Sequence, residues 1–454
     1  MTSTPPVLKR KIGLLQATSI NMIDMAGIGP FVMIYLVIQI SGGPHFLYAW
    51  FIGALLSFAD ALIWSELGAA YPMAGGSYNF LKLAYGKEKW GRLFSFLYVW
   101  QTMIQAPLVM ASAAIGFSEY LSFFVPIDPM MAKIISGSVI ILVVISLYRK
   151  IEEIGKLSIV LWISMIIIFF WIIGGGIVHG KMLEPLKHIH DNIEVNQLFF
   201  IALGQATVKT IYTYLGYYNI CHLGGEIVNP GKNIPRSMLI SVAGITLLYI
   251  AANLSITSVI SWQSAMKNKY IVSEFIKTIS GVQAANIGTV IILVVAFASL
   301  FSATLGYSRV PYAAAKDGAF FTVFSKLHPT KNFPYVSLLF LGAVAFVFSL
   351  LFKMKHVIDG ILAMRILVQF IAQAIGVVLL RKKNGKEKLP FKMWLYPLPV
   401  IVSIPIWLFI FFSTGIAALF AVILIMIGIL VFYLTKDWWN KEETVLASEI
   451  NANG

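Results

Sequence analysis

Apolar runs long enough to cross a lipid bilayer recur along the whole chain, and they constrain its fold more than any other feature. Hydrophobic residues make up 59% of the 454 residues and charged residues only 12%, whereas a soluble domain carries about 25% charged residues. As a helix, roughly 20 apolar residues cross the hydrocarbon core. Because backbone groups inside the bilayer must be hydrogen-bonded within the protein, the sequence predicts an all-α, multi-pass integral membrane protein.

The apolar runs predict twelve transmembrane helices joined by short connections. The predicted spans cover residues 14–40, 45–70, 92–124, 131–148, 154–178, 197–228, 236–262, 284–315, 334–353, 356–381, 395–414 and 416–434. Residues 1–13 before them form a predicted cytoplasmic tail, and the polar residues 437–454 after them form a second tail, which we expect to be disordered. The short connections leave no room for an inserted soluble domain.

The basic residues indicate how the chain is oriented. The formal net charge is +14. If the N-terminus is cytoplasmic, most Lys and Arg residues fall in cytoplasmic segments, as the positive-inside rule requires. They include Lys9, Arg10, Lys11, Lys87, Lys89, Arg92, Lys232, Arg236 and the basic residues between Arg381 and Lys392. The charge therefore predicts a cell-membrane protein with both termini in the cytoplasm, not a nucleic-acid binder, and contact with anionic lipid is a secondary possibility.

Two of the predicted spans carry residues that interrupt a helix. Gly27, Gly29 and Pro30 lie in the first span, and Gly216 lies in the sixth. Glycine weakens a helix, and proline removes a backbone donor. The two spans start five spans apart and cross in opposite directions. This pattern predicts an inverted 5+5 repeat, about 14–178 and 197–381, with the helices of 382–436 appended.

Paired interruptions in the two halves of a repeat are the best sequence indication of a secondary transporter's binding site. The alternative is that these residues only kink their helices, because glycine and proline are common in membrane helices.

Four motifs give the chain its resemblance to a known family. They are Gly27-Ile28-Gly29-Pro30-Phe31, the stretch from Glu66 to Tyr78, the stretch from Gly225 to Arg236, and the stretch from Gly306 to Gly318. In this order and at these spans they resemble the amino acid–polyamine–organocation (APC) superfamily of permeases, in particular its L-type and polyamine-uptake branch. The resemblance implies the leucine-transporter fold, with broken helices 1 and 6, and transport of an amino acid or an amine.

The resemblance also implies a role for the first break. Backbone amides of Gly27, Ile28 and Gly29 would hold the substrate carboxylate, at the positive end of a half-helix. Many members carry serine where this chain has Ile28, so a hydroxyl contact is missing and a different carboxylate geometry remains open.

The second break would hold the substrate's amino group. The resemblance implies that carbonyl groups of Tyr214, Leu215 and Gly216 bind it, and Tyr212 stands where many members keep an aromatic gate. Asn219 completes the predicted substrate-binding residues. The alternative for each tyrosine is packing or anchoring at the membrane interface.

Three ionisable residues are candidates for coupling or gating. Asp24 precedes the first break, and an ionisable group inside a span is a functional candidate. It could accept a proton, pair with Lys156, pair with a cationic substrate, or simply cap a helix. Glu66 lies near the cytoplasmic end of the second span and is predicted to belong to a structural or gating ion pair.

Lys156 lies early in the fifth span. Several cation-independent members of the family carry a lysine at this place, with its ammonium group where a sodium ion would sit between helices 1 and 8. The alternative is a lysine that snorkels to water at the cytoplasmic end of its helix.

Two further charges inside spans attract attention. We expect Lys209 and Glu119 to form an ion pair in the outer half of the membrane, since a buried lysine needs a partner. Arg365 also lies within a span, but the sequence assigns it no role.

The function predicted from these features is transport by alternating access, coupled to protons or run as exchange. Neutral amino acids are favoured because the second break carries no acid. Asp24 keeps polyamines or cationic amino acids as the alternative. A sensor that binds amino acids without flux is a different class, and no catalytic constellation indicates an enzyme.

No cofactor or metal is predicted, because His188, His190 and Asp191 stand without a further ligand motif, and a zinc site needs about four ligands. Cys221 is the single cysteine, and none lies between Phe123 and Ala132. In the L-type branch a cysteine in that loop joins a glycoprotein partner, so we expect no disulfide-linked heavy chain.

Overall fold

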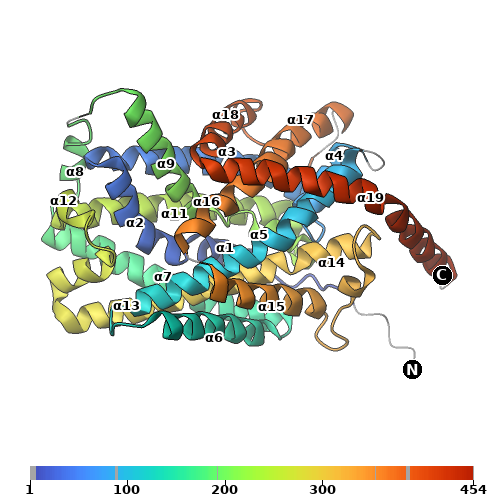
Figure 1. The fold of residues 1–454 in the computed structure, drawn as a ribbon, viewed down its shortest axis with the longest axis horizontal. Helices are drawn as coiled ribbons and strands as arrows, with labels where there is room; N and C mark the ends of the chain where they lie inside the picture. Colours follow the sequence, from blue (N-terminus) through green and yellow to red (C-terminus); the bar gives the residue numbers. More distant parts are fainter. Residues whose placement is uncertain (1–6, 87–89, 192, 353, 385–388, 453–454) are drawn as a thin grey trace.

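The computed structural model describes residues 7–86, 90–191, 193–352, 354–384 and 389–452, and for 354–357 and 436–452 it describes the backbone alone. Throughout the described residues the secondary structure is helical apart from two isolated β-bridges. Lys87 and Lys89, which contribute to the predicted charge asymmetry, lie outside the described residues. The prediction of an all-α protein is confirmed (Figure 1).

The helices are numbered along the chain. The first half holds α1 (Leu14–Met25), α2 (Ile28–Ser41), η1 (Pro44–Phe46), α3 (Leu47–Ala70), α4 (Ser77–Ala84), α5 (Trp90–Leu121), α6 (Pro129–Leu147), α7 (Ile151–His179), α8 (Glu184–Lys187) and α9 (Gln197–Tyr214). The second half holds α10 (Asn219–His222), η2 (Gly224–Glu226), α11 (Pro230–Val259), α12 (Trp262–Ala265), α13 (Ile271–Tyr307), α14 (Arg309–Lys316), η3 (Thr322–Ser325), α15 (Tyr335–Leu351), α16 (Met354–Arg365), the π-helical η4 (Ile366–Ile371), α17 (Ala372–Asn384), α18 (Leu398–Ser413) and α19 (Ile416–Ala452).

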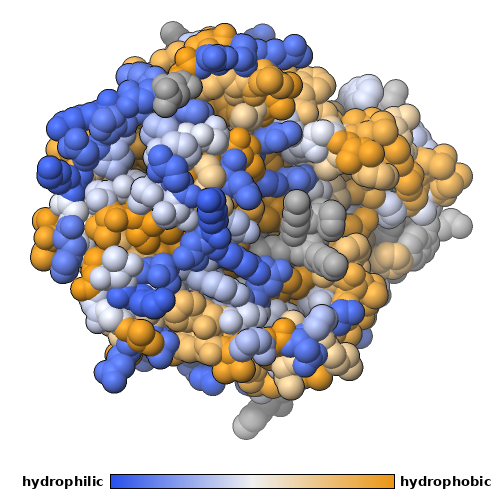
Figure 2. All heavy atoms as spheres, turned by 60° about the vertical axis from the view of Figure 1, so that its left-hand side comes forward, coloured by the Kyte–Doolittle hydropathy of each residue, from blue (hydrophilic) through white to orange (hydrophobic). Residues whose placement is uncertain are grey.

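Many of these helices are long and apolar enough to cross a membrane. Within the described residues nine stretches qualify by length and composition, and Tyr335–Leu351 and Leu398–Ser413 are shorter apolar helices. The structure thus agrees with a multi-pass membrane protein. The segment before α1 and the end of α19 lie at the same end of the molecule (Figure 1). At the opposite end, which bears α8 and α12, hydrophilic residues gather on the surface beside hydrophobic ones (Figure 2).

The spans differ in how deeply they lie in the protein. In the stretch from Ile358 to Asn384, 78% of the most apolar window is buried, against 17% in the stretch from Ile416 to Thr435. The first stretch, formed by α16, η4 and α17, therefore belongs to the core. The second lies at the periphery, where side chains such as Leu419 and Phe420 are exposed.

The two broken spans pack against each other in the core. The helix α2 packs against α9, and α1 packs against α10, α7, α11 and α13. This arrangement brings the gap between α1 and α2 next to the gap between α9 and α10.

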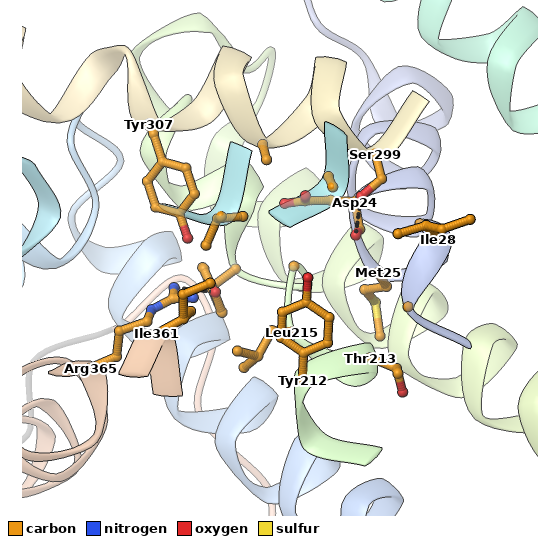
Figure 3. A pocket seen from close by; sticks show the side chains of 17 residues that line it. Asp24, Met25, Ile28, Tyr212, Thr213, Leu215, Ser299, Tyr307, Ile361 and Arg365 are labelled. Atoms are coloured by element: carbon orange, nitrogen blue, oxygen red, sulfur yellow. Dashed lines mark hydrogen bonds between the residues drawn. The ribbon is translucent and has the colours of Figure 1, made fainter. Parts of the chain in front are cut away.

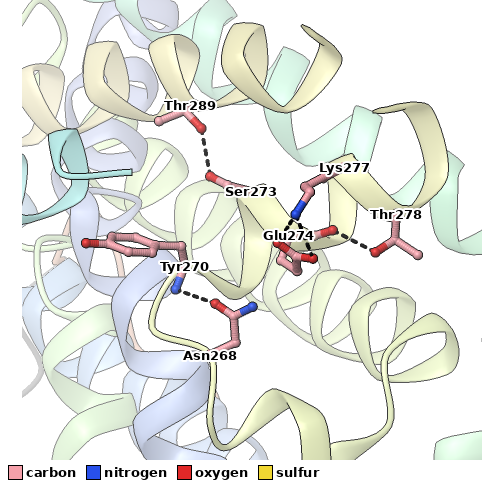
Figure 4. A network of polar contacts seen from close by, with 7 residues as sticks. All are labelled: Asn268, Tyr270, Ser273, Glu274, Lys277, Thr278 and Thr289. Carbon is pink, nitrogen blue, oxygen red and sulfur yellow. Dashed lines mark hydrogen bonds and ion pairs between the residues drawn. The ribbon is translucent and has the colours of Figure 1, made fainter. Parts of the chain in front are cut away.

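A helical hairpin covers the end of the molecule opposite the termini. The helix α13 reverses direction at Gly281, whose φ is 85°, so its first arm begins at Ile271, before the predicted start of the span at residue 284. The two arms are joined by a 2.8 Å hydrogen bond between Ser273 and Thr289 (Figure 4). The loop before the hairpin is fixed to α5 by a 3.2 Å ion pair between Lys269 and Glu119.

The predicted ion pair between Glu119 and Lys209 is wrong. The hairpin supplies Glu119 with Lys269, and Lys209 on α9 donates instead to Asp359 on α16 at 2.5 Å. The sequence could not reveal this exchange, because it depends on which helices lie side by side.

The predicted tail of residues 437–454 is described only in part, because residues 453–454 lie outside the described residues. The backbone of α19 continues as a helix through Ala452.

A group of polar contacts, which we call the terminal clasp, closes the end of the molecule that bears the termini. The side chains of Glu226 and Arg309 form two hydrogen bonds of 2.8 and 2.9 Å and are almost fully buried. Arg10, ahead of α1, donates to the carbonyl oxygens of Ile227 at 3.0 Å and Pro72 at 3.3 Å. The clasp joins the N-terminal segment to chain that follows α3, α10 and α13.

Candidate functional site

A small cavity lies where the two broken spans meet. Its volume is about 50 Å³, which is space for one or two water molecules. Its lining includes Asp24, Gly27, Ile28 and Gly29 from the first broken span, Tyr212, Leu215, Gly216 and Tyr218 from the second, and Ser299, Tyr307 and Arg365 from α13 and α16. Figure 3 shows side chains of Asp24, Tyr212, Tyr307 and Arg365 directed toward a common centre.

The first break is short and depends on glycine. Only Ala26 and Gly27 separate α1 from α2. A Cβ atom on Gly27 would lie 2.5 Å from the Cβ of Ser299, so only glycine allows α13 to approach this closely. No side chain caps the N-terminus of α2, whose first residues, Ile28 and Gly29, line the cavity. Its amide groups are therefore available to a ligand.

Hydroxyl groups satisfy the carbonyl end of α1. Ser302 on α13 donates to the Ile20 oxygen at 2.7 Å, and Ser299 donates to the Asp24 oxygen at 3.1 Å. Carbonyl groups in the last turn of a helix lack partners within the helix. Ser299 supplies a partner to one of them, the Asp24 oxygen, and together the two serines attach the second half of α1 to α13.

The second break is longer and more irregular. Residues 215–218 separate α9 from α10, and Gly216 has a φ of 124°. A Cβ atom there would lie 2.8 Å from the nitrogen of Met25 and 2.9 Å from the carbonyl carbon of Asp24. Gly216 is thus required both for its backbone conformation and for contact with the first break.

Tyr249 on α11 connects the two breaks. Its buried hydroxyl lies 2.8 Å from the Met25 oxygen at the end of α1 and 3.0 Å from the Thr213 oxygen near the end of α9. One proton is shared between these two acceptors, in a three-centre hydrogen bond. The carbonyl ends of the two half-helices are thus held by one side chain.

The tyrosines of the second break have different surroundings. Tyr212 lines the cavity, and its hydroxyl lies 2.9 Å from that of Ser112 on α5. Tyr218 lines it as well and accepts a hydrogen bond from Arg365. Tyr217 donates at 2.5 Å to the buried Asp60 on α3. The side chain of Tyr214 packs against Trp50 and Tyr249 and does not line the cavity.

Most of the predicted substrate-binding residues meet at the cavity. Gly27, Ile28, Gly29, Tyr212, Leu215 and Gly216 line it, as does the coupling candidate Asp24. Any contribution of Tyr214 is restricted to its backbone. Asn219 does not line the cavity, because its side chain donates to the carbonyl and hydroxyl oxygens of Ser302 at 2.7 and 2.9 Å. The binding role of Asn219 stays a prediction, and the contacts that the structure shows for its amide nitrogen are to α13.

The two other coupling candidates lie away from the cavity. Lys156 is exposed on α7 and makes no hydrogen bond or ion pair with a described residue, so its predicted position between the first and eighth spans is wrong. A lysine close to the start of its helix can extend to water. Glu66 is a buried ion-pair member, as expected. Arg381 donates to it at 2.6 Å and the backbone nitrogen of Met393 at 2.7 Å.

Sequence reasoning missed two charged residues of this region. Arg365 lines the cavity with 1% of its surface exposed, and Asp60 holds Tyr217 in the second break. The available signal was an ionisable residue within an apolar span. That signal does not say whether such a residue faces a cavity or a neighbouring helix.

The whole described site lies within a region that matches known proteins. A family model described as "Amino acid permease" matches residues 12–435. The chain is 27% identical over 422 residues to the serine/threonine exchanger SteT of Bacillus subtilis, covering 90% of this chain and 91% of the exchanger. It is 25% identical to the methylthioribose transporter of Bacillus subtilis, covering 94% of this chain and 93% of that protein. It is 24% identical to the large neutral amino acids transporter small subunit 2 of Mus musculus, covering 96% of this chain and 82% of that protein.

Proposed function

This chain belongs to the amino acid permease family of the APC superfamily, and from that premise we propose that it moves amino acids across a membrane by alternating access. It is a transporter and not an enzyme. The observation that carries the mechanism is the cavity enclosed between two broken spans. Interrupted helices that face each other in the core are the arrangement in which secondary transporters bind their substrates.

The proposed architecture has twelve spans, with the first ten forming the inverted repeat. The gap between α1 and α2 and the gap between α9 and α10 are its corresponding breaks. The proposed topology has the termini and the terminal clasp in the cytoplasm and the hairpin of α13 outside. The segment from residue 7 to the start of α1 and the end of α19 lie at the same end of the molecule, which supports an even number of spans.

The proposed substrate orientation follows from the two breaks. The α-carboxylate binds the uncapped N-terminus of α2 at Ile28 and Gly29, where amide groups and the helix dipole favour an anion. The ammonium group lies near Asp24 and the carbonyl groups of Leu215 and Gly216. Both sets of residues line the same cavity, which supports this orientation.

The size of the cavity supports a cycle of opening and closing. A volume of about 50 Å³ is too small for an amino acid, since it offers space for only one or two water molecules. We propose that the contact of Tyr212 with Ser112 closes the cavity on the outer side and that the contact of Tyr218 with Arg365 closes it on the cytoplasmic side. We propose that these two contacts open in alternation.

The proposal also covers the charge of the substrate side chain and the ion to which transport is coupled. The guanidinium group of Arg365 in the lining disfavours lysine, arginine and polyamines, because like charges repel in a buried site. Transport is coupled to protons through Asp24 or proceeds as exchange. The sequence argument against sodium rested on Lys156, and its exposed position removes that argument.

We further propose that the protein works without a disulfide-linked partner. The single cysteine, Cys221, is buried in α10. A thiol in that position cannot reach a second chain.

Uptake into proteoliposomes tests the proposal. Vesicles preloaded with unlabelled amino acids are offered labelled amino acids or putrescine, with and without an inward pH or sodium gradient. We expect uptake of amino acids, a response to pH or to internal substrate, and no uptake of putrescine.

Two variants complete this test. Gly216→Leu fills the second break and should abolish uptake, whereas Gly174→Leu in α7, where a Cβ meets no atom within 4 Å, should leave it intact. Binding without flux in the unsubstituted protein would contradict the transporter proposal and leave a sensor.

A further inference from the structure

The guanidinium group of Arg365 is buried beside the cavity without a carboxylate partner. Its side chain is 1% exposed, and within the described residues no carboxylate lies at ion-pair distance from it. Its hydrogen bonds and ring contacts are to neutral groups, and the buried carboxyl groups of Asp24 and Asp60 act on it only from beyond ion-pair distance. Its Nε donates to Gln369 at 2.9 Å, its Nη2 donates to the Tyr218 hydroxyl, and it lies 4.8 Å from the Tyr218 ring and 5.7 Å from the Tyr307 ring.

These contacts do not use the full capacity of the guanidinium group. It carries five N–H donors in a planar fork, and Nη1 makes no hydrogen bond with a described residue. A buried charge is costly unless a partner of opposite charge satisfies it. The faces of the aromatic rings offset part of that cost. They do not, however, provide a hydrogen-bond acceptor for the remaining N–H groups of the guanidinium group. The missing acceptor is an anion.

The backbone around Arg365 holds its guanidinium group at the cavity. Arg365 is the last residue of α16, and the π-helical turn Ile366–Ile371 follows it directly. π-helical turns often occur at functional sites. Because Gln369 lies within this turn and accepts from the Arg365 Nε, it orients the guanidinium group toward the lining. Gln369 is therefore a positioning residue.

The cavity thus offers two separate positions for negative charge. One is the uncapped N-terminus of α2, at Ile28 and Gly29, and the other is the guanidinium group of Arg365, which reaches the lining from α16. Figure 3 shows Arg365 and Ile28 on opposite sides of the centre, with Asp24 on the side of Ile28. A ligand that matches this pattern carries an anion at each end and a cation near one of them.

We propose that the substrates are α-amino acids with an anionic side chain and that Arg365 determines this specificity. This inference rests on the proposed amino acid transport. The α-carboxylate lies at α2, the ammonium group lies near Asp24, and the side-chain carboxylate pairs with Arg365. The proposal replaces the neutral substrates favoured by the sequence, because a neutral side chain offers no charged acceptor to the Nη1 donors of Arg365.

Uptake and competition in proteoliposomes test this inference with pairs of ligands that differ only in charge. Glutamate is compared with glutamine and aspartate with asparagine, both as labelled substrates and as competitors. Since charge-assisted pairs between arginine and carboxylate are among the strongest hydrogen bonds, we expect one of the acids to be preferred over its amide by roughly tenfold or more.

Variants of Arg365 identify the source of the preference. Arg365→Gln should abolish the preference, lowering the ratio of acid uptake to amide uptake by roughly tenfold, and Arg365→Lys should retain part of the preference. Arg236→Gln, at an exposed position on α11, removes the same charge away from the cavity and should change nothing.

The outcomes separate this inference from the proposed function. If the protein carries no amino acid at all, the proposed function fails. If it carries amides as well as or better than acids, or if Arg365→Gln lowers uptake of acids and amides equally, transport stands and the inference is overturned. If Arg365→Gln does not fold, the melting temperature of the unsubstituted protein is measured with each ligand instead. The inference then requires that glutamate or aspartate raise this temperature more than the matching amide does.

Discussion

The two breaks that line the cavity perform the same task with different chemistry. The first consists of two small residues, Ala26 and Gly27, and presents backbone groups to the cavity. The second spans residues 215–218 and is surrounded by tyrosines that are held by side chains elsewhere: Tyr217 by Asp60 and Tyr218 by Arg365. The first break is fixed by close packing, and the second is fixed by a network of polar contacts.

This difference assigns different parts of recognition to the two breaks. Backbone amides at the start of α2 bind any α-carboxylate, because every amino acid carries one. The network around the second break includes Arg365, so it can respond to the substrate side chain. The common groups of a substrate are therefore bound at the first break, and its identity is sensed at the second.

The largest effect should come from Gly216→Ala, which tests whether the second break depends on its backbone. The substitution combines a φ of 124° with contacts below 3.0 Å to backbone atoms of Asp24 and Met25. Such strain costs about 1–3 kcal/mol, and overpacking costs a similar amount. Because the obstructing atoms are backbone, we expect uptake to fall about a hundredfold and the melting temperature to drop. Gly174→Ala is the control, and unchanged uptake by Gly216→Ala would contradict the close contact of the breaks.

The next effect should come from Gly27→Ala, which tests the close packing of the first break. The φ of Gly27 is −69°, so alanine is not strained there, but its Cβ would lie 2.5 Å from the Cβ of Ser299. Overpacking of this kind costs about 1–3 kcal/mol, and we expect uptake to fall by roughly tenfold. The additional substitution Ser299→Gly should restore part of it. A double variant no better than Gly27→Ala would show that α13 does not limit this break.

A smaller effect should follow from Tyr249→Phe. This variant removes a hydrogen-bonded link between the two breaks without substituting a residue of either break. The variant removes the hydroxyl shared by the Met25 and Thr213 oxygens and leaves two buried carbonyl groups with one donor fewer. One lost hydrogen bond of this kind costs about 1–3 kcal/mol. We expect a lower melting temperature and a severalfold change in uptake. Tyr270→Phe, whose hydroxyl contacts the Glu119 oxygen in the hairpin region, is the control and should leave uptake unchanged.

The sequence predicted the positions of the two breaks, because these depend on residues close together in the chain. Gly27 and Gly216 lie at the breaks, and the sequence identified both as residues that interrupt a helix, whereas Gly29, which it named with them, lies in the first turn of α2. The partners of charged side chains could not be identified in this way, because they depend on packing between distant segments. Lys209 pairs with Asp359 on α16 and not with Glu119, and Lys156 is exposed on α7.

The roles of Arg365 and Tyr249 were hidden for the same reason. In the sequence, Arg365 is one cation within a span and Tyr249 is one tyrosine of the 19 in the chain. Arg365 becomes a candidate only when α16 brings it to the cavity, and Tyr249 only when α11 lies beside both breaks.

The smallest effect should come from Gly29→Ala, which distinguishes Gly27 in the first break from Gly29 in the first turn of α2. A Cβ on Gly29 would lie 3.2 Å from the Thr213 Cγ2 methyl group and 3.5 Å from the Tyr212 ring, and a small movement of these side chains relieves the contact. Alanine also favours the helix by about 1 kcal/mol over glycine. We therefore expect uptake within about threefold of the original and an equal or higher melting temperature. If Gly29→Ala were as damaging as Gly27→Ala, the first break would depend on free space at the start of α2 as well as on its contact with α13.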